Sequence, residues 1–157
     1  AGYDFGLLKE VEKINDGQKS ALMKKIENII WNLHGKTVSV LGLSFKPDTD
    51  DLRYAPALYI IDMLLKQGAK VRAYDPISMA KARPILGKRV KFCKDAYDAA
   101  KDSDCLVIAT EWSEFKELDL KKVKKLMRQS VIVDGRNIYE PAEVRKLGFT
   151  YAGMGRR

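Results

Sequence analysis

The sequence predicts an α/β fold in which a long helix precedes a doubly wound, mostly parallel, six-stranded Rossmann-like sheet. Strand and helix patterns alternate five times after Gly35, which is the signature of a parallel sheet. One amphipathic helical stripe runs from about residue 7 to residue 33. The chain has 157 residues, enough for one domain able to bury about two-thirds of its unfolded surface.

We expect the first helix to run from about Leu7 to Leu33. The positions that form its stripe recur at spacings of three and four: Leu7, Val11, Ile14, Gln18, Leu22, Ile26, Ile29 and Leu33. The second half, from Leu22 onward, can pack on its own domain, whereas the first half needs another surface. Gly17 weakens the helix by about 1 kcal/mol relative to Ala. His34, just before Gly35, is expected to cap its C-terminus. We therefore divide the chain into a helix, residues 1–34, and a Rossmann-like domain, residues 35–157.

The remaining elements follow in strict alternation. The predicted strands are Thr37–Leu41, Lys70–Tyr74, Arg89–Phe92, Cys105–Ala109, Val131–Asp134 and Phe149–Ala152. The predicted helices are Tyr54–Lys66, Met79–Leu86, Asp95–Ala100, Leu118–Arg128 and Pro141–Lys146. With right-handed crossovers, the usual strand order is 3-2-1-4-5-6. That order brings the loops after Leu41, Ala109 and Asp134 to one crevice.

The loop after the first strand is rich in charge and poor in glycine. It carries Lys46, Arg53 and several acids, but Gly42 alone replaces the three glycines of a dinucleotide fingerprint. Side chains rather than bare backbone are therefore expected to meet any phosphate here. The alternative is a charged surface loop in which Asp51 caps the next helix.

Composition narrows the classes of function. The net charge is +8 and the isoelectric point about 9.4, but the 29 basic residues are interleaved with 21 acids, and no nucleic-acid-binding motif occurs. We expect no nucleic-acid partner. No long apolar run or signal-like start occurs, so we expect a cytoplasmic protein with no membrane association. Cys105 is expected to be a small buried hydrophobe, and neither it nor Cys93 belongs to a metal or redox motif.

Four ordered motifs resemble the C-terminal UDP-binding domain of the UDP-glucose 6-dehydrogenases. They are GLSFKPDTDDLRYAP at residues 42–56, TEW at 110–112, DGRNIY at 134–139 and GMGR at 153–156. The start, AGYDFGLL at residues 1–8, is similar to the family segment that follows the catalytic motif. Asn15, Asp16 and Gln18 match polar positions of the family's central helix.

The resemblance implies an NAD-dependent, two-step oxidation of the sugar C6 alcohol of UDP-glucose to a carboxylate through a cysteine thioester. The family's nucleophile lies in a G-G-x-C-F-x-K-D motif, which does not occur here. We therefore expect a truncated enzyme that is inactive by itself and depends on a missing N-terminal domain for NAD. The resemblance also implies a homodimer formed through the first helix.

The resemblance assigns substrate contacts to Phe45, Lys46 and Arg136, and an NAD contact to Arg53. These residue types suit a nucleotide sugar, because cations bind phosphates, an aromatic ring covers a base or sugar, and the planar guanidinium of arginine binds oxyanions in two-pronged fashion. The alternatives are a surface cation for Lys46, a core filler for Phe45, and a salt bridge to a neighbouring acid for Arg136. Tyr54 stands where the family usually has an acid.

Two further positions have open interpretations. Asp75 closes the second strand as a ribose-binding acid would, but the missing glycine fingerprint favours a turn or cap, and we assign it no role in NAD binding. Trp112, beside Glu111, either packs over the crevice or anchors its loop.

UDP-glucose is the first choice of substrate, because the related GDP-mannose and N-acetylmannosamine dehydrogenases generally lack the DGRN turn. Another UDP- or GDP-sugar, or a freestanding nucleotide-binding or dimerisation module, is the alternative.

Overall fold

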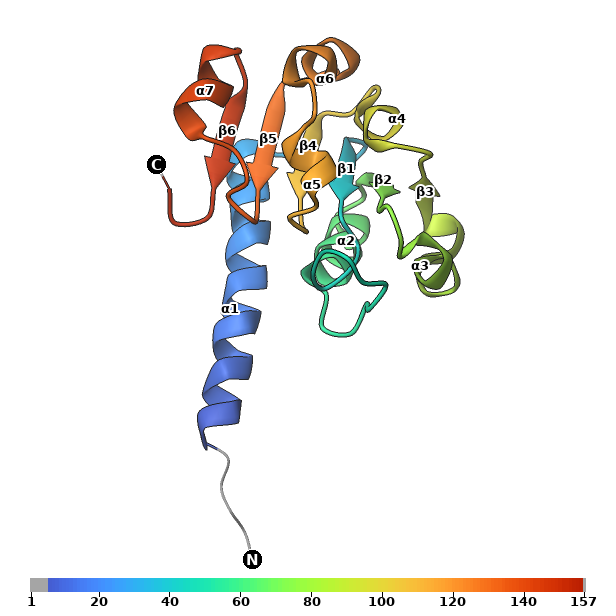
Figure 1. Ribbon diagram of the computed structural model, residues 1–157, viewed down its shortest axis with the longest axis vertical. Helices are drawn as coiled ribbons and strands as arrows, with labels where there is room; N and C mark the ends of the chain where they lie inside the picture. The colour runs from blue at the N-terminus through green and yellow to red at the C-terminus, as the bar shows by residue number, and fades with distance from the viewer. Residues whose placement is uncertain (1–5, 157) are drawn as a thin grey trace, which may run out of the picture.

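Six parallel strands form a single sheet in a computed structural model that describes residues 6–156. The order β3-β2-β1-β4-β5-β6 is the one predicted, and Figure 1 shows helices on both faces of the sheet. The strands are β1 (Thr37–Leu41), β2 (Lys70–Tyr74), β3 (Val90–Phe92), β4 (Cys105–Ile108), β5 (Val131–Asp134) and β6 (Thr150–Gly153). The Rossmann-like fold class is therefore confirmed. Residues 1–5 of the segment AGYDFGLL lie outside the described residues.

Two apolar cores, one on each face, hold the helices to the sheet. The helices are α1 (Gly6–Ile29), α2 (Pro56–Lys66), α3 (Met79–Leu86), α4 (Ala96–Ala100), α5 (Ser113–Lys116), α6 (Leu120–Leu126) and α7 (Pro141–Lys146), with a 3₁₀ turn η1 (Gly87–Arg89). Side chains of α1, α2 and α3 pack on one face, around the fully buried Ile26, Ile60 and Ile61. Side chains of α4 to α7 pack on the other face, around Phe115.

Helix α1 divides as its stripe predicted. Leu22 and Ile26 are buried in the domain core, whereas Val11 and Ile14 are 46% and 60% exposed. Figure 1 shows the N-terminal half of α1 extending well beyond the sheet. The second half of the helix is therefore part of the domain, and the first half presents apolar side chains to solvent.

The predicted end of α1 is wrong, and so is the cap assigned to His34. The helix ends at Ile29, and the Asn32 side chain accepts a hydrogen bond from the backbone N of His34 at 3.0 Å. Asparagine side chains that bond the backbone two residues on favour a turn over a helix. His34 is exposed and lies in the turn that leads to β1.

Other boundaries also differ from the prediction, and local backbone chemistry explains two of them. Helix α2 begins at Pro56, since Ala55 precedes a proline and is extended, and Tyr54 has a positive φ of 60°. The helix predicted from Leu118 to Arg128 is shorter, because Asp119 caps α6 through its bonds to the backbone N of Lys121 and Lys122. The short helix α5 was not predicted. Strand β3 and helix α4 each begin one residue later than predicted, β4 ends one residue earlier, and β6 is shifted by one residue at both ends.

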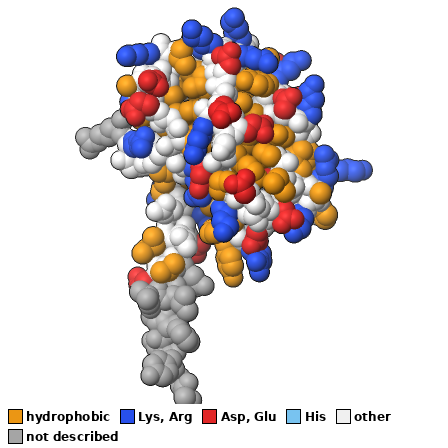
Figure 2. All heavy atoms as spheres, in the orientation of Figure 1, with side chains coloured by type: hydrophobic (Ala, Val, Ile, Leu, Met, Phe, Trp, Pro, Cys, Tyr) orange, Lys and Arg blue, Asp and Glu red, His pale blue; other side chains and the backbone are white. Residues whose placement is uncertain are grey.

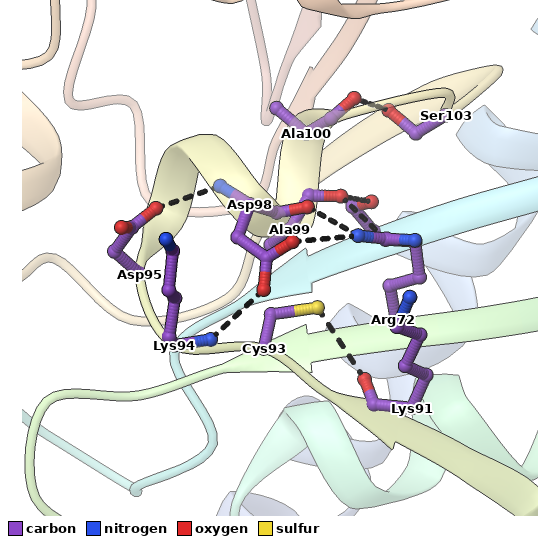
Figure 3. A network of polar contacts seen from close by, with 10 residues as sticks. Arg72, Lys91, Cys93, Lys94, Asp95, Asp98, Ala99, Ala100 and Ser103 are labelled. Carbon is purple, nitrogen blue, oxygen red and sulfur yellow. Dashed lines mark hydrogen bonds and ion pairs between the residues drawn. The ribbon is translucent and has the colours of Figure 1, made fainter.

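A polar network around Arg72 of β2 holds helix α4 in place (Figure 3). The guanidinium of Arg72 donates to the carbonyl of Ala99 at 3.1 Å and to the carboxylate of Asp98 at 3.1 Å. Cys93 lies beside this network and is 1% exposed, and its Sγ is 3.6 Å from the carbonyl of Lys91. Burial raises the pKa of the Cys93 thiol and raises that of Cys105 to about 12. Both thiols are therefore structural, as expected for Cys105.

Charges of both signs are spread over the surface. Figure 2 shows acidic side chains interspersed with basic ones on the face in view, and basic side chains along its upper edge. Within residues 6–156 no helix combines the length and apolarity needed to cross a bilayer.

Candidate functional site

A cavity of about 550 Å³ lies between helix α1 and the carboxyl ends of the strands. Small-molecule sites in proteins have volumes of this order, and parallel sheets bind ligands at this edge. The lining residues come from five segments far apart in the sequence: Asn15, Asp16, Gln18, Lys19 and Leu22 from α1; Phe45 and Tyr54 from the loop after β1, with Pro56 at the start of α2; Ala109 after β4; Gly135 and Arg136 after β5; and Met154 after β6.

At the switch point between β1 and β4, Gly42 allows the segments that follow these two strands to pack closely. Its φ is +89°, and a Cβ at this position would lie 2.5 Å from the Cβ of Thr110. The Thr110 hydroxyl donates to the carbonyl of Ser44 at 2.7 Å, so the loops after β1 and β4 are joined directly. Gly42 therefore serves close packing between protein segments.

Asp75, at the end of β2, organises the loop after β1. Its Oδ2 accepts from the backbone N of Leu43 at 2.7 Å and of Ser44 at 3.2 Å, and from the Trp112 indole at 3.2 Å. Its Oδ1 accepts from the backbone N of Ile77 and Ser78. Of the predicted alternatives, a turn or a cap, these bonds confirm the turn, because the N-cap of α3 is Ser78 and Asp75 precedes it by three residues. Asp75 also bonds the loop after β1, which was not predicted.

The environment of Asp75 lowers the pKa of its carboxyl below the ordinary value. Burial alone would raise the pKa, but backbone N–H groups that include those of Leu43, Ser44 and Ser78 stabilise the carboxylate more strongly. Trp112 is 6% exposed and bonded to Asp75, so it anchors its loop and does not cover the crevice.

The turn after β5 is fixed by two polar side chains. Buried Asp134 accepts from the backbone N of Arg136 at 3.0 Å and of Tyr139 at 3.1 Å. Asn137, with a φ of 54°, bonds the backbone N and O of Met154 through its side-chain amide. The DGRN and GMGR motifs are therefore joined by hydrogen bonds between the Asn137 side chain and the Met154 backbone.

Arg136 lines the cavity and is held by an ion pair. Its Nε contacts a carboxylate oxygen of Glu111, which follows β4. The predicted alternative, a salt bridge to a neighbouring acid, is therefore present, but Arg136 also forms part of the cavity wall. A carboxylate partner fixes the plane of the guanidinium without occupying all of its donors.

Of the other three predicted site residues, one lines the cavity and two do not. Phe45 is 45% exposed and lines the cavity. Lys46, the next residue, is exposed and has no hydrogen-bond or ion-pair partner among the described residues, and it lies outside the cavity lining. Arg53 points elsewhere, into a shallow hollow with Asp51 and Lys81.

Arg53 is bound to Asp51 by two nitrogens of its guanidinium. The distances are 3.0 Å from Nε to Oδ1 and 2.8 Å from Nη2 to Oδ2. This contact is the first cause of the lowered pKa of Asp51, about 2. The alternative role of Asp51 as a cap of α2 is wrong, because that helix begins without a side-chain cap and Asp51 instead accepts from the backbone N of Arg53.

The first βα turn does not fit a dinucleotide phosphate. A pyrophosphate cradle needs free backbone N–H groups after the first strand. Here the N–H groups of Leu43 and Ser44 are bonded to Asp75, and Gly42 is packed on Thr110. No cluster of three or more His, Cys, Asp or Glu suited to a metal ion occurs among the described residues. Any ligand in the cavity would therefore be bound by side chains, among them the cationic Lys19 and Arg136 and the aromatic Phe45, and not by a backbone phosphate loop or a metal cluster of the described residues.

Comparison with known proteins identifies the family. Residues 39–141 match the model of the UDP-glucose/GDP-mannose dehydrogenase family, UDP binding domain. The chain belongs to this family.

Relatives share both sequence and fold with the chain over nearly its whole length. UDP-glucose 6-dehydrogenase TuaD of Bacillus subtilis is 46% identical over 156 residues, which are 99% of this chain and 34% of the relative. The UDP-glucose 6-dehydrogenase of Pseudomonas aeruginosa is 40% identical over 163 residues, covering 99% of this chain and 36% of the relative. The chain thus spans about a third of the length of these relatives.

Solved structures of nucleotide-sugar dehydrogenases superpose on the same fold. A UDP-glucose dehydrogenase from Pyrobaculum islandicum has a TM-score of 0.81 and 32% identity, covering 95% of this chain and 32% of its own. A UDP-D-ManNAc dehydrogenase from Pyrococcus horikoshii has a TM-score of 0.77 and 30% identity, covering 99% and 35%. The UDP-binding domain predicted from the four motifs is confirmed at the level of the family.

Some residues of the cavity were missed by sequence reasoning. Asn15, Asp16 and Gln18 were noted as family-like polar positions, and Gln18 interrupts the apolar stripe of α1, which signals a polar contact. Lys19 carried no comparable signal, because a lysine on a helix usually faces solvent. Met154 lies in the GMGR motif, which was noted for its resemblance to the family but not as a part of the site.

Proposed function

We propose that this chain is the nucleotide-sugar-binding part of an NAD-dependent UDP-glucose 6-dehydrogenase, which oxidises UDP-glucose to UDP-glucuronate in two steps. One observation carries the proposal. In a chain of this family, Phe45, Arg136 and the polar residues of α1 line one cavity at the carboxyl edge of the sheet. A relative that is 46% identical to this chain over 156 residues is a UDP-glucose 6-dehydrogenase.

Each proposed substrate contact follows from the chemistry of its side chain. Arg136 offers charge-assisted donors to the diphosphate from a guanidinium that Glu111 already orients. Lys46 has no protein partner among the described residues, so its ammonium is available to a phosphate or hydroxyl at the edge of the cavity. The exposed ring of Phe45 covers the base or sugar.

The oxidation chemistry requires parts that this chain does not supply. Two hydride transfers need NAD bound beside the sugar, and the first βα turn does not fit that cofactor. A thioester needs an accessible thiolate, whereas Cys93 and Cys105 are 1% and 0% exposed and their thiol pKa values are raised. We therefore assign NAD binding to the N-terminal part of the full-length enzyme. Arg53 is proposed to contact NAD at the domain boundary, since its side chain is 83% exposed.

Two further proposals concern the assembly. We propose a homodimer, because the exposed Val11 and Ile14 on the projecting half of α1 form an apolar surface that a two-fold partner would bury. We also propose a cytoplasmic location, in keeping with a nucleotide-sugar substrate. The second candidate function is a dehydrogenase of another UDP-sugar, favoured by the 30% identity to the UDP-D-ManNAc dehydrogenase.

Calorimetry with UDP and GDP tests the substrate class. We expect UDP to bind with an affinity in the high micromolar to millimolar range, since only half of the site is present, and GDP to bind less well. Lys46→Ala and Arg136→Ala should each weaken UDP binding by about ten- to a hundredfold, because a hydrogen bond to a charged group contributes roughly 1.5 to 3 kcal/mol.

The control is Lys66→Ala, which removes an exposed lysine paired with Asp62 on α2, outside the cavity. It should bind UDP like the parent. Preferential binding of GDP would contradict the choice of substrate, and unchanged binding by both site variants would contradict the assigned residues. The purified chain should form no NADH from UDP-glucose. Turnover would contradict the assignment of NAD binding to the N-terminal part of the full-length enzyme.

A further inference from the structure

Lys19 of helix α1 is a second cation of the cavity. It lines the cavity together with Arg136, although the two residues belong to segments 117 positions apart in the sequence. Its side chain is only 17% exposed, which is unusual for a lysine on a helix surface. The ammonium is therefore held against the protein near the cavity.

Asp16, which also lines the cavity, pairs with this ammonium. The Lys19 Nζ lies 3.2 Å from the Asp16 carboxylate, and the Asp16 side chain is 75% exposed. Within this pair the carboxylate is mostly exposed and the lysine side chain is mostly buried, and both residues line the cavity. An exposed pair of this kind contributes little to stability, so its value lies in orienting the lysine.

A close packing contact fixes Lys19 relative to Arg136. Leu22, one turn after Lys19, is 4% exposed and packs directly on Gly135, where an added Cβ would lie 2.8 Å from a methyl carbon of Leu22. Gly135 is the residue before Arg136. One contact thus places a cation of the helix and a cation of the β5 turn on the same cavity.

We propose that Lys19 binds the diphosphate of the nucleotide sugar together with Arg136, which makes α1 a part of the binding site. This inference rests on the proposed function. A diphosphate carries charge on two phosphoryl groups, so it is bound best by two cations set apart from each other. Arginine gives planar, two-pronged contacts, and lysine gives a point charge that can follow either group.

Lys13 provides a matched control on the same helix. It also pairs with an acid three residues earlier, Glu10, at 2.9 Å. Its side chain is 72% exposed, and it does not line the cavity. The two lysines share helix and pairing and differ in access to the cavity. Methionine is a suitable replacement for both, because it forms helices nearly as well as lysine.

The test is an NMR titration of Lys19→Met, Lys19→Arg and Lys13→Met with UDP and with uridine. We expect Lys19→Met to weaken UDP binding about tenfold and to leave uridine binding unchanged, because only the phosphate contact is lost. Lys19→Arg should retain most of the affinity, since it keeps the charge. Lys13→Met should bind both ligands like the parent. Thermal melting of each variant checks that α1 remains folded.

The outcomes separate this inference from the proposed function. If Lys19→Met binds UDP as tightly as the parent while Arg136→Ala binds weakly, Lys19 is not a ligand, and the proposed function stands. Equal weakening of UDP and uridine would show that the substitution perturbs the site by packing alone, which also overturns the inference. If the parent chain binds no UDP, the proposed function and this inference fail together.

Discussion

Replacing Asp75 by asparagine should destabilise the domain by about 3 kcal/mol. The carboxylate accepts from five N–H groups, those of Leu43, Ser44, Ile77, Ser78 and the Trp112 indole, and is 1% exposed. An asparagine has the same shape but only one acceptor oxygen. Whichever way the amide is turned, at least two of these donors face its NH₂ group. Each buried donor left without an acceptor costs about 1 to 3 kcal/mol.

Urea denaturation at pH 7, followed by circular dichroism and tryptophan fluorescence, measures this change. The slope of the free energy of unfolding against urea should stay constant while the midpoint falls. The control is Asp95→Asn, which replaces a carboxylate that only caps α4 through Asp98 N, a role in which asparagine serves equally well. It should alter stability by less than about 0.5 kcal/mol.

The pH dependence gives a second check on Asp75. Its pKa in the folded state lies below the ordinary value of 3.8. A depressed carboxyl pKa contributes stability that is present above the unfolded pKa and is lost as the pH falls through the folded pKa. The difference between parent and Asp75→Asn should therefore shrink below about pH 4. An Asp75→Asn variant as stable as the parent at pH 7, or a difference unchanged at pH 3, would refute the role given to this carboxylate.

Three other predictions concern the Asp51–Arg53 ion pair, the packing of Gly135 and the two buried cysteines. The carboxyl of Asp51 should titrate in an NMR experiment near pH 2, and Arg53→Ala should return it toward its ordinary range; no change in that variant would contradict the ion pair. Gly135→Ala should lower stability by about 1 to 3 kcal/mol and weaken UDP binding, because its Cβ would lie 2.8 Å from a backbone oxygen and from α1; a variant like the parent in melting and titration would argue against this packing. In the native protein Cys93 and Cys105 should react with a thiol reagent only as fast as the domain opens, and fast labelling without denaturant would contradict their burial.

The fold could be predicted from the sequence because the periodicity of apolar residues and the positions of turn-forming residues agree along most of the chain. Strands β1, β2 and β5 have the predicted bounds, and proline and glycine mark many of the turns. The errors occur where side chains compete with the backbone. Asn32 ends α1 early, and Asp119 starts α6 late, and neither bond can be read from the apolar pattern.

The site was predictable only in part. Topology placed the loops after β1, β4 and β5 together, so Phe45 and Arg136 were expected at one cavity and lie there. The pairing of Arg136 with Glu111, and the place of Lys19, depend on side-chain packing between segments distant in sequence. Lys46 and Arg53 share a loop with Phe45 but lie outside the cavity lining, and the positive φ angles of Asp48 and Tyr54 in that loop could not be predicted from the sequence pattern.

The most direct test of the proposed binding site is a map of UDP binding by backbone amide chemical shifts. We expect the largest changes at Phe45, Gly135 and Arg136 and on helix α1 near Lys19, around one cavity. Two other hollows provide the contrast: one lined by residues such as Asp95 and Glu117, and one around Arg53. Changes confined to either of them, or to the projecting first half of α1, would contradict the claim that the strand ends and α1 together form the nucleotide-sugar site.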